Sequence, residues 1–318
     1  MTGHSPEPLS PLAAVSVQTV AEPVSSETNS KTFGRWLAIY ADLFKARLTS
    51  LVLLTTLVGF YMGLRGSMNY ILMLNTLLAT ALVAGGASAL NQWMERDYDA
   101  RMRRTQTRPL PSGQLQPLTA LWVGCFCAVS GLIYLAVTVN FITCALGGAT
   151  LLTYLFVYTP LKRISWLNTA AGAVPGALPP LMGWTAATGH LYISAWALFG
   201  ILALWQIPHF LAIAWVYRDE YARAGFQMLP NVDPTGNRCG RQAVGLSFVL
   251  LLCSVAPFFL GMAGFSYLAG AITLGLVFFW FSIRFSRYLD VPQARRLFLA
   301  SILYLPLLLG LLVLDKIK

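Results

Sequence analysis

Charged residues are scarce in this chain. Of its 318 residues, 22 are Lys or Arg and 12 are Asp or Glu, so charged side chains make up 11% of the sequence while hydrophobic residues make up 57%. A chain this apolar cannot cover the surface of a water-soluble domain with polar side chains, and its composition indicates a polytopic membrane protein. The few charged residues are therefore the first candidates for functional residues.

Cysteine supplies neither a disulfide framework nor a metal site. There are five cysteines, an odd number, and four of them lie in apolar runs: Cys125, Cys127, Cys144 and Cys253. Cys125 and Cys127 are two apart and face away from each other on a helix. We interpret these four as buried, apolar-like side chains and place Cys239 in a loop.

The amino-terminal segment has too few apolar residues to form a core. Residues 1–33 are rich in Ser, Thr, Pro and Glu, and we expect a disordered polar leader followed by a transmembrane domain over 34–318. No arginine precedes Arg35, and three acidic residues are present, Glu7, Glu22 and Glu27. That composition is atypical of a mitochondrial transit peptide, and no secretory signal is evident.

Long apolar runs fill the rest of the chain and predict an all-α bundle. By length and polarity we expect about nine membrane-spanning helices. Their approximate limits are 46–64, 70–92, 118–139, 141–158, 168–187, 192–216, 242–263, 266–286 and 297–315.

Basic residues are distributed unequally between the two sides of these spans. One side carries the amino terminus and nearly all Lys and Arg residues, whereas the other carries Arg65, Lys316 and Lys318. By the positive-inside rule the amino terminus and the charged loops are cytoplasmic. Because the basic residues adjoin membrane spans, the net charge of +10 reflects topology in the lipid bilayer, and no nucleic-acid partner is expected.

The densest group of charges, residues 91–113, follows the second apolar run and contains three carboxylates and five arginines. Asn91, Glu95 and Asp99 are spaced four apart and share one helical face. Asp97 lies about 200° from Glu95 and points elsewhere unless the helix frays. Oxygen ligands gathered in this way suit Mg²⁺, which commonly bridges a carboxylate to substrate phosphate. The alternative is a solvated helix end anchored by arginines.

Further polar clusters fall on the same side of the membrane as this stretch. They are residues 154–163, 217–225 and 45–47. A metal-bridged diphosphate needs cation-binding oxygens together with donors for its remaining oxygens. Each basic residue alone is better explained as a topology anchor, but the recurrence of acidic and basic clusters on one face favours a site.

At these residues the chain resembles the UbiA-type intramembrane prenyltransferases, and within them the protoheme IX farnesyltransferases (heme O synthases). The pattern Asn-x3-Asp-x3-Asp matches Asn91, Glu95 and Asp99, with Glu in place of the first Asp. A longer set of blocks runs in order from about residue 91 to 230: ERDYDARMRRTQTRPLPSG, YTPLKR, NTAAGAVPGALPPLMGWTAATG, WQIPHF and YRDEYARAGFQMLP. In the second acidic motif, Arg223 stands where another Asp usually follows Asp219.

This resemblance implies transfer of a farnesyl group from farnesyl diphosphate to a vinyl group of heme b, with water added, giving heme O and diphosphate. It also implies Mg²⁺ as cofactor and a multi-pass protein of the bacterial inner membrane with cytoplasmic active-site loops. A downstream heme-processing protein would be a further partner. Both substrates have large apolar parts, the farnesyl chain and the porphyrin ring, which explains a site built inside a membrane.

The resemblance and the charge pattern together assign residues to roles. The expected catalytic residues are Asn91, Glu95, Asp97, Asp99 and Asp219. The expected metal ligands are Asn91, Glu95, Asp99 and Asp219. The expected substrate-binding residues are Lys45, Arg47, Arg103, Arg104, Arg108, Tyr158, Lys162, Arg163, His209, Arg218 and Arg223.

His209 lies within an apolar run, nearly three helical turns before Asp219. An intramembrane histidine is a functional candidate, and its imidazole can ligate heme iron. Pro208 should kink the helix beside it. The alternative is a core histidine that hydrogen-bonds a neighbouring carbonyl.

Two glycine-containing segments have structural explanations. Residues 85–89 (GGASA) let helix backbones approach closely. Residues 172–180 (GAVPGALPP) predict a broken or kinked fifth helix, which a membrane tolerates if it lines a cavity. Packing alone could account for both segments and is the favoured explanation for the first.

Two other functions compete with farnesyl transfer to heme. Another prenyltransferase of this type, acting on a quinone precursor or a chlorin, would share the acidic motifs. A transporter would place polar residues at the bilayer midplane, whereas here the charges gather at one end.

Overall fold

The computed structural model describes residues 1–3 and 26–317, with side chains described from Gly34 onward among the latter. Most of the expected leader, residues 4–25, lies outside the described residues. The chain divides into two units, Met1–Ala38 and Ile39–Lys318. The second unit contains all the expected spans, and the architecture below is that of this unit.

A helix not expected from the sequence, α1 (Ser26–Leu43), precedes the first span. It begins at Ser26, inside the segment 1–33, whose assignment as a disordered leader stays a prediction. Ile39 and Leu43 are four residues apart and pack with Leu110 and Leu115. This helical spacing places both apolar side chains on one buried face in the last turns of α1.

In the described part of the second unit the regular secondary structure is helical, apart from an isolated β-bridge between Ala263 and Lys316. Its elements after α1 are α2 (Ala46–Gly63), α3 (Tyr70–Asp99), α4 (Pro117–Thr138), α5 (Phe141–Leu152), the π-helix η1 (Thr153–Tyr158), α6 (Thr159–Leu161), α7 (Asn168–Ala177), α8 (Pro179–Thr188), α9 (Ile193–Val216), α10 (Arg218–Ala224), α11 (Leu229–Val232), α12 (Asn237–Ser254), α13 (Ala256–Phe259), α14 (Phe265–Tyr288) and α15 (Val291–Leu314).

Eight helical segments between residues 26 and 317 are long and apolar enough to cross a membrane. They correspond to eight of the nine expected spans. The remaining one, expected at 168–187, is two helices of ten residues each, α7 and α8. The break falls at Leu178 because Pro179 and Pro180 have no N–H to continue the helical ladder. The broken fifth helix expected from the sequence is confirmed.

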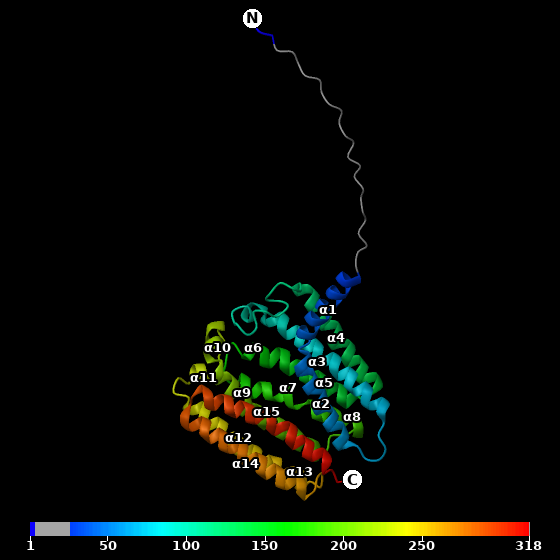
Figure 1. Ribbon diagram of the computed structural model, residues 1–318. Helices are drawn as coiled ribbons and strands as arrows, with labels where there is room; N and C mark the ends of the chain where they lie inside the picture. Colours follow the sequence, from blue (N-terminus) through cyan, green and yellow to red (C-terminus); the bar gives the residue numbers. More distant parts are fainter. Residues whose placement is uncertain (4–25, 318) are drawn as a thin grey trace. The chain divides into compact units, whose positions relative to one another are not determined.

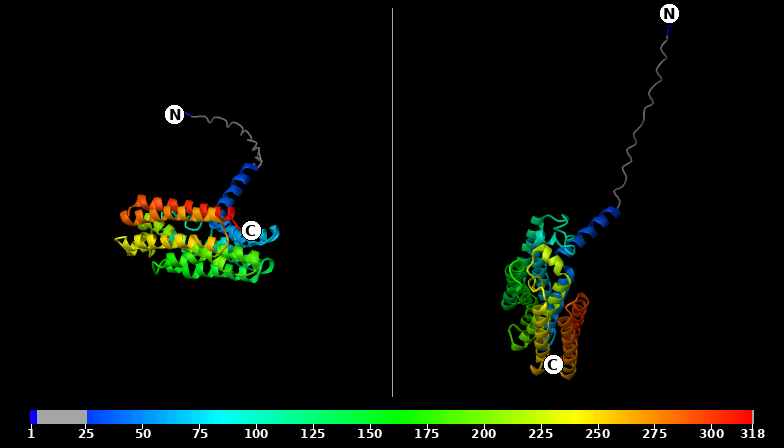
Figure 2. Two further views of the ribbon diagram at one scale, coloured as in Figure 1. Left: turned by 90° about the horizontal axis from the view of Figure 1, so that it is seen from below. Right: turned by 90° about the vertical axis from the view of Figure 1, so that its left-hand side faces the viewer.

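The long helices run alongside one another in both orientations (Figures 1 and 2). α3 packs along α4, α2 along α8, and α14 between α12 and α15, while α9 contacts α7, α12 and α15. The largest apolar cluster joins α2, α8, α9, α12, α14 and α15. Exposed Leu, Ile, Phe and Trp side chains on the outside of this unit fit a surface solvated by lipid.

Two helix pairs come close enough to exclude any side chain larger than hydrogen. A Cβ on Gly86 would lie 2.5 Å from the backbone nitrogen of Ala128 on α4, which confirms the packing role expected for residues 85–89. A Cβ on Gly183 of α8 would lie 1.9 Å from the carbonyl oxygen of Thr56 on α2. These contacts fix the helices whose ends carry the polar clusters.

Two boundaries differ from expectation in ways that matter for the site. α3 extends to Asp99, seven residues beyond the expected limit, because neighbouring segments bury one polar face of its last two turns. α12 begins at Asn237, so Cys239 is buried in a first helical turn and does not lie in a loop.

The close approach of α2 and α8 yields a stability prediction. Gly183→Ala should lower the free energy of unfolding by about 1–3 kcal/mol, because the added methyl overpacks against backbone. Gly148→Ala on α5, where no atom lies within 4 Å of the added Cβ, is the matched control and should be neutral or slightly stabilising. Thermal unfolding of both purified variants in one detergent measures this; equal shifts would contradict the packing argument.

Candidate active site

The last three turns of α3 present oxygen-bearing side chains to the interior. Asn91, Glu95 and Asp99 are 0%, 3% and 1% exposed, whereas the Asp97 side chain is 73% exposed. The helix is regular through this segment, so residues four apart stack on one face. Two carboxylates and one amide therefore lie buried in a row, and Asp97 points into solvent.

Lys162, just beyond α6, forms a buried ion pair with Glu95. Its Nζ donates to both carboxylate oxygens, at 2.9 and 3.1 Å. Burial acts to lower the pKa of Lys162, but the Glu95 carboxylate outweighs it and raises that pKa above its ordinary value. Removing either partner would leave an uncompensated charge in a buried place.

Arg108 neutralises Asp99 in the same manner. One of its terminal guanidinium nitrogens donates to Asp99 Oδ2 at 2.6 Å. The Thr105 hydroxyl donates to the Asp99 carbonyl at 2.8 Å, which satisfies an acceptor at the end of α3. The loop after α3 thus folds back over the helix that precedes it.

Lys45 completes the row at Asn91. Its Nζ donates to Asn91 Oδ1 at 2.8 Å. The residue caps α2 with a left-handed backbone, φ 47°, a conformation that costs energy for a side chain other than glycine. Burial, together with the nearby charges of Arg108 and Lys162, lowers the pKa of Lys45 to about 7.

The π-helical turn η1 and the first residue of α6 supply contacts that were not predicted from the sequence. The Tyr154 hydroxyl lies 3.4 Å from Lys45 Nζ, and the Thr159 hydroxyl accepts from Asn91 Nδ2 at 3.0 Å. The turn ends just before Pro160, which cannot donate to the helical ladder. Such single π-turns recur at functional sites, and the Thr-Pro pair is the sequence signal that could have indicated one.

Aromatic rings surround the Lys162 ammonium. It lies 4.4 Å from the centroid of Tyr158 and 5.9 Å from that of Phe226, and Phe226 in turn stacks on Tyr98. The backbone N–H of Gln227 donates to the Lys162 carbonyl at 2.7 Å. The segment after α10 therefore forms part of the wall around the ion pair, a role that Phe226 had not been assigned from sequence.

Asp219 lies apart from the row on α3. Its side chain is 92% exposed, and its nearest ionic partner is Arg218 at 3.8 Å. Among the residues that the structure describes, no three His, Cys, Asp or Glu side chains are gathered so that they could hold a metal ion. The expected four-ligand set is thus not assembled here: three members line one face of α3, and Asp219 lies in solvent on α10.

The other expected substrate-binding arginines fall into two groups. Arg163 donates to the Met94 carbonyl at 2.8 Å and stacks over Tyr98, and Arg104 donates to the Tyr221 hydroxyl at 3.1 Å. Both therefore hold segments of the site together. The second group is exposed and has no side-chain partner among the described residues: Arg47, Arg103 and Arg223.

His209 lies in the middle of α9, away from the charged row. Its Nδ1 is 2.7 Å from the Ser301 hydroxyl, and its ring lies between Trp205 and Phe298, at 4.9 and 5.1 Å between centroids. The alternative considered for His209 was a hydrogen bond to a neighbouring carbonyl. In the structure its partner is instead the hydroxyl of Ser301. With Nδ1 engaged, Nε2 is the nitrogen left for another partner.

Sequence comparison places the chain among known proteins. The profile of the UbiA prenyltransferase family matches residues 52–305. The chain belongs to this family. The protoheme IX farnesyltransferase of Solibacter usitatus is 44% identical over 286 residues, which cover 87% of this chain and 98% of that protein. That of Salinibacter ruber is 46% identical over 276 residues, with the same coverage.

Solved structures agree with the UbiA fold. A digeranylgeranylglyceryl phosphate synthase superposes with a TM-score of 0.76 at 15% identity, covering 88% of this chain and 98% of its own. A UbiA homolog from Archaeoglobus fulgidus, bound to DMAPP and Mg²⁺, gives 0.64 at 18% identity, covering 86% and 99%. At these identities the likeness concerns the fold alone.

The buried ion pair of this UbiA-family protein should dominate the stability of the charged end. Lys162→Gln strands the Glu95 charge and should lower the free energy of unfolding by about 3–5 kcal/mol. The double variant Lys162→Gln/Glu95→Gln should recover most of that loss, because no bare charge remains. Chemical unfolding of the purified proteins measures both.

A matched control is available at the exposed pair of Arg96 and Asp97, whose atoms are 3.7 Å apart. Asp97→Asn should change stability by less than about 1 kcal/mol, as exposed pairs do. If Lys162→Gln/Glu95→Gln were no more stable than Lys162→Gln alone, an unpaired Glu95 charge would not be the cause of the lost stability.

Proposed function

We propose that this protein transfers the farnesyl group of farnesyl diphosphate to a vinyl group of heme b, giving heme O. The bond between the farnesyl carbon and diphosphate breaks, a carbon–carbon bond forms to the vinyl group, and water supplies a hydroxyl while a proton is released. The names of the relatives, at 40–46% identity over most of their length, support heme b as acceptor. We place the protein in a bacterial inner membrane with this site cytoplasmic, as the basic loops indicate.

One observation carries the diphosphate part of this proposal. Three basic side chains, Lys45, Lys162 and Arg108, each contact one oxygen-bearing side chain of α3. Two carboxylates thus face three basic groups in a buried place. Such a site can accept a multiply charged anion together with a divalent cation. The carboxylates can bind the divalent cation, and the basic side chains can bind the anion.

The oxygen donors fit Mg²⁺. Asn91, Glu95 and Asp99 offer carboxylate and amide oxygens, which are the ligands that a hard cation prefers. When bound there, Mg²⁺ would neutralise charge that develops on the leaving diphosphate. Asp219 can join this set only if α10 moves, because its carboxylate faces solvent.

The basic side chains act on the diphosphate itself. Lys45, Lys162 and Arg108 donate to its oxygens and stabilise the negative charge that grows as the carbon–oxygen bond breaks. Exposed arginines at the same end draw the anion toward the site; they are Arg47, Arg103, Arg218 and Arg223. Arg104 and Arg163 hold the loop and the end of α3 in place.

The farnesyl cation left after diphosphate departs must be protected from water. Tyr154 and Tyr158 stack on each other at 5.6 Å, and with Phe226 they wall the site with aromatic rings. Their faces also favour a positive charge. We assign His209 to contact with the heme, because its Nδ1 is fixed by Ser301 and the rings of Trp205 and Phe298 pack against its imidazole.

Purified protein incubated with heme b, farnesyl diphosphate and Mg²⁺ tests the function. We expect a farnesylated, hydrated heme detected by mass spectrometry, loss of the product with EDTA, and recovery when excess Mg²⁺ is added. A quinone precursor such as a hydroxybenzoate, supplied in place of heme b, is the parallel arm. Prenylation of that acceptor with none of heme b would replace this proposal by the rival one.

The two aspartates at the end of α3 should differ in their importance for catalysis, because Asp99 is buried and Asp97 is exposed. If Asp99 provides even ~3–4 kcal/mol of transition-state stabilisation, Asp99→Asn should slow transfer about 10²- to 10³-fold. Asp97→Asn, which alters an exposed carboxylate of the same type two residues away, should cost much less. Single-turnover rates on folded variants, checked by circular dichroism, give the ranking. The reverse ranking would mean that α3 unwinds before residue 97 during catalysis.

A further inference from the structure

A cavity of about 580 Å³ lies at the end of α2 opposite to Lys45. α2 has 18 residues, so about 27 Å of helix separates the two places. The walls come from the end of α2, from α8 and the start of α9, from residues 260–262, and from the carboxyl-terminal residues 316 and 317. The active-site proposal uses none of these residues.

Two cations and no acid line this cavity. Arg65 and Lys316 are among the lining residues, which include no Asp or Glu. The neighbouring carboxylate of Asp315 accepts instead from the backbone N–H of Tyr267 at 2.7 Å. Burial, and then the charge of Arg65, lower the pKa of Lys316. Two like charges therefore face one space, and none of the lining residues that the structure describes supplies a carboxylate to them.

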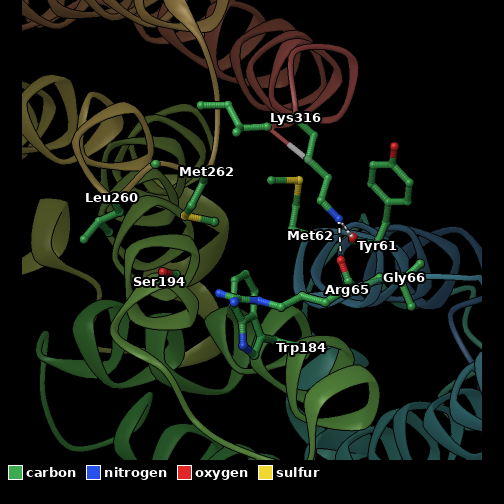
Figure 3. A pocket seen from close by; sticks show the side chains of 12 residues that line it. Tyr61, Met62, Arg65, Gly66, Trp184, Ser194, Leu260, Met262 and Lys316 are labelled. Atoms are coloured by element: carbon green, nitrogen blue, oxygen red, sulfur yellow. Dashed lines mark hydrogen bonds between the residues drawn. The ribbon is translucent and has the colours of Figure 1, made fainter.

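Hydrogen-bond donors in the cavity are left unused. Lys316 Nζ donates to the carbonyls of Tyr61 and Leu64 at 2.6 and 2.8 Å, which leaves one of its three N–H groups. Arg65 and the Ser194 hydroxyl have no side-chain partner among the described residues. In Figure 3 the Arg65 side chain extends across the pocket above Trp184, and Lys316 enters from the carboxyl-terminal segment.

The position of these cations is unusual for this chain. The positive-inside rule keeps basic residues off this side of the membrane, and the sequence places only Arg65, Lys316 and Lys318 there. Two of the three line one cavity. Each follows the last residue of a spanning helix, α2 or α15, by two positions, which is the level of lipid headgroups.

The rest of the cavity wall is apolar. Met62, Leu64, Leu260 and Met262 line it together with the rings of Tyr61 and Trp184. An inorganic anion would use the cations and leave these surfaces without a partner. An anion joined to an apolar body would use both.

We propose that this cavity binds the phosphate headgroup of an anionic amphiphile, with Arg65, Lys316 and Ser194 as donors to the phosphate. Basic pockets between membrane helices bind anionic headgroups by the same chemistry. The bound molecule bridges the end of α2, the start of α9 and the carboxyl-terminal segment. It is independent of farnesyl transfer, since it lies at the other end of the spanning helices.

The test uses the purified full-length protein and follows lipid binding by native mass spectrometry and by thermal unfolding. Phosphatidylglycerol should be retained and raise Tm, and phosphatidylcholine should do so much less. Arg65→Gln should weaken phosphatidylglycerol binding at least tenfold, and Arg65→Lys should restore part of it. Arg241→Gln makes the same charge change at an exposed position on α12 and should leave binding unchanged.

The same measurements distinguish a phospholipid headgroup from free inorganic phosphate as the ligand. Inorganic phosphate that raises Tm in the parent protein but not in Arg65→Gln, without selective retention of phosphatidylglycerol, would identify the ligand as a free anion in the same site. Equal retention of phosphatidylglycerol by the parent and by Arg65→Gln would overturn the proposal. Ser194→Ala removes one donor and leaves the backbone unaltered, so it should weaken binding less than Arg65→Gln. We expect the Arg65→Gln variant to fold normally, because the Arg65 side chain is exposed.

Discussion

The buried ion pair between Lys162 and Glu95 is the interaction on which the charged end of this protein depends. A carboxylate at the end of a membrane helix is costly to bury unless a cation and hydrogen bonds compensate it. Lys162 does this with both carboxylate oxygens. To reach Glu95, Lys162 must lie beside α3, so the pair helps to hold the end of the segment that runs from α5 through η1 and α6.

The same logic extends along α3. Arg108 from the following loop and Lys45 from the start of α2 satisfy Asp99 and Asn91. In the proposed reaction these oxygens would hold Mg²⁺, and the three basic side chains would donate to the diphosphate. The groups that compensate one another in this structure are therefore the same groups that the proposed reaction requires. Strain at Lys45, with φ 47°, is consistent with a residue held in place for this purpose.

The two ends of the spanning helices differ in their chemistry because the membrane separates them. At one end carboxylates and cations meet in a shared cluster walled by aromatic rings. At the other, Arg65 and Lys316 face a cavity without any acid in its wall. In the proposed reaction the first end exchanges partners among charges that it already contains, whereas in the proposed binding site at the second end the anion comes from a bound amphiphile.

The sequence by itself determined the fold class, the approximate spans and the row Asn91, Glu95 and Asp99, because hydropathy, helical spacing and family motifs are local properties of the chain. The break in the fifth helix followed in the same way from Pro179 and Pro180. Only the tertiary structure decided which cation meets which carboxylate, because those pairs join residues 46, 67 and 9 positions apart. It alone placed Asp219 in solvent and formed the π-turn that brings Thr159 to Asn91, since both depend on how helices pack and not on spacing along one of them.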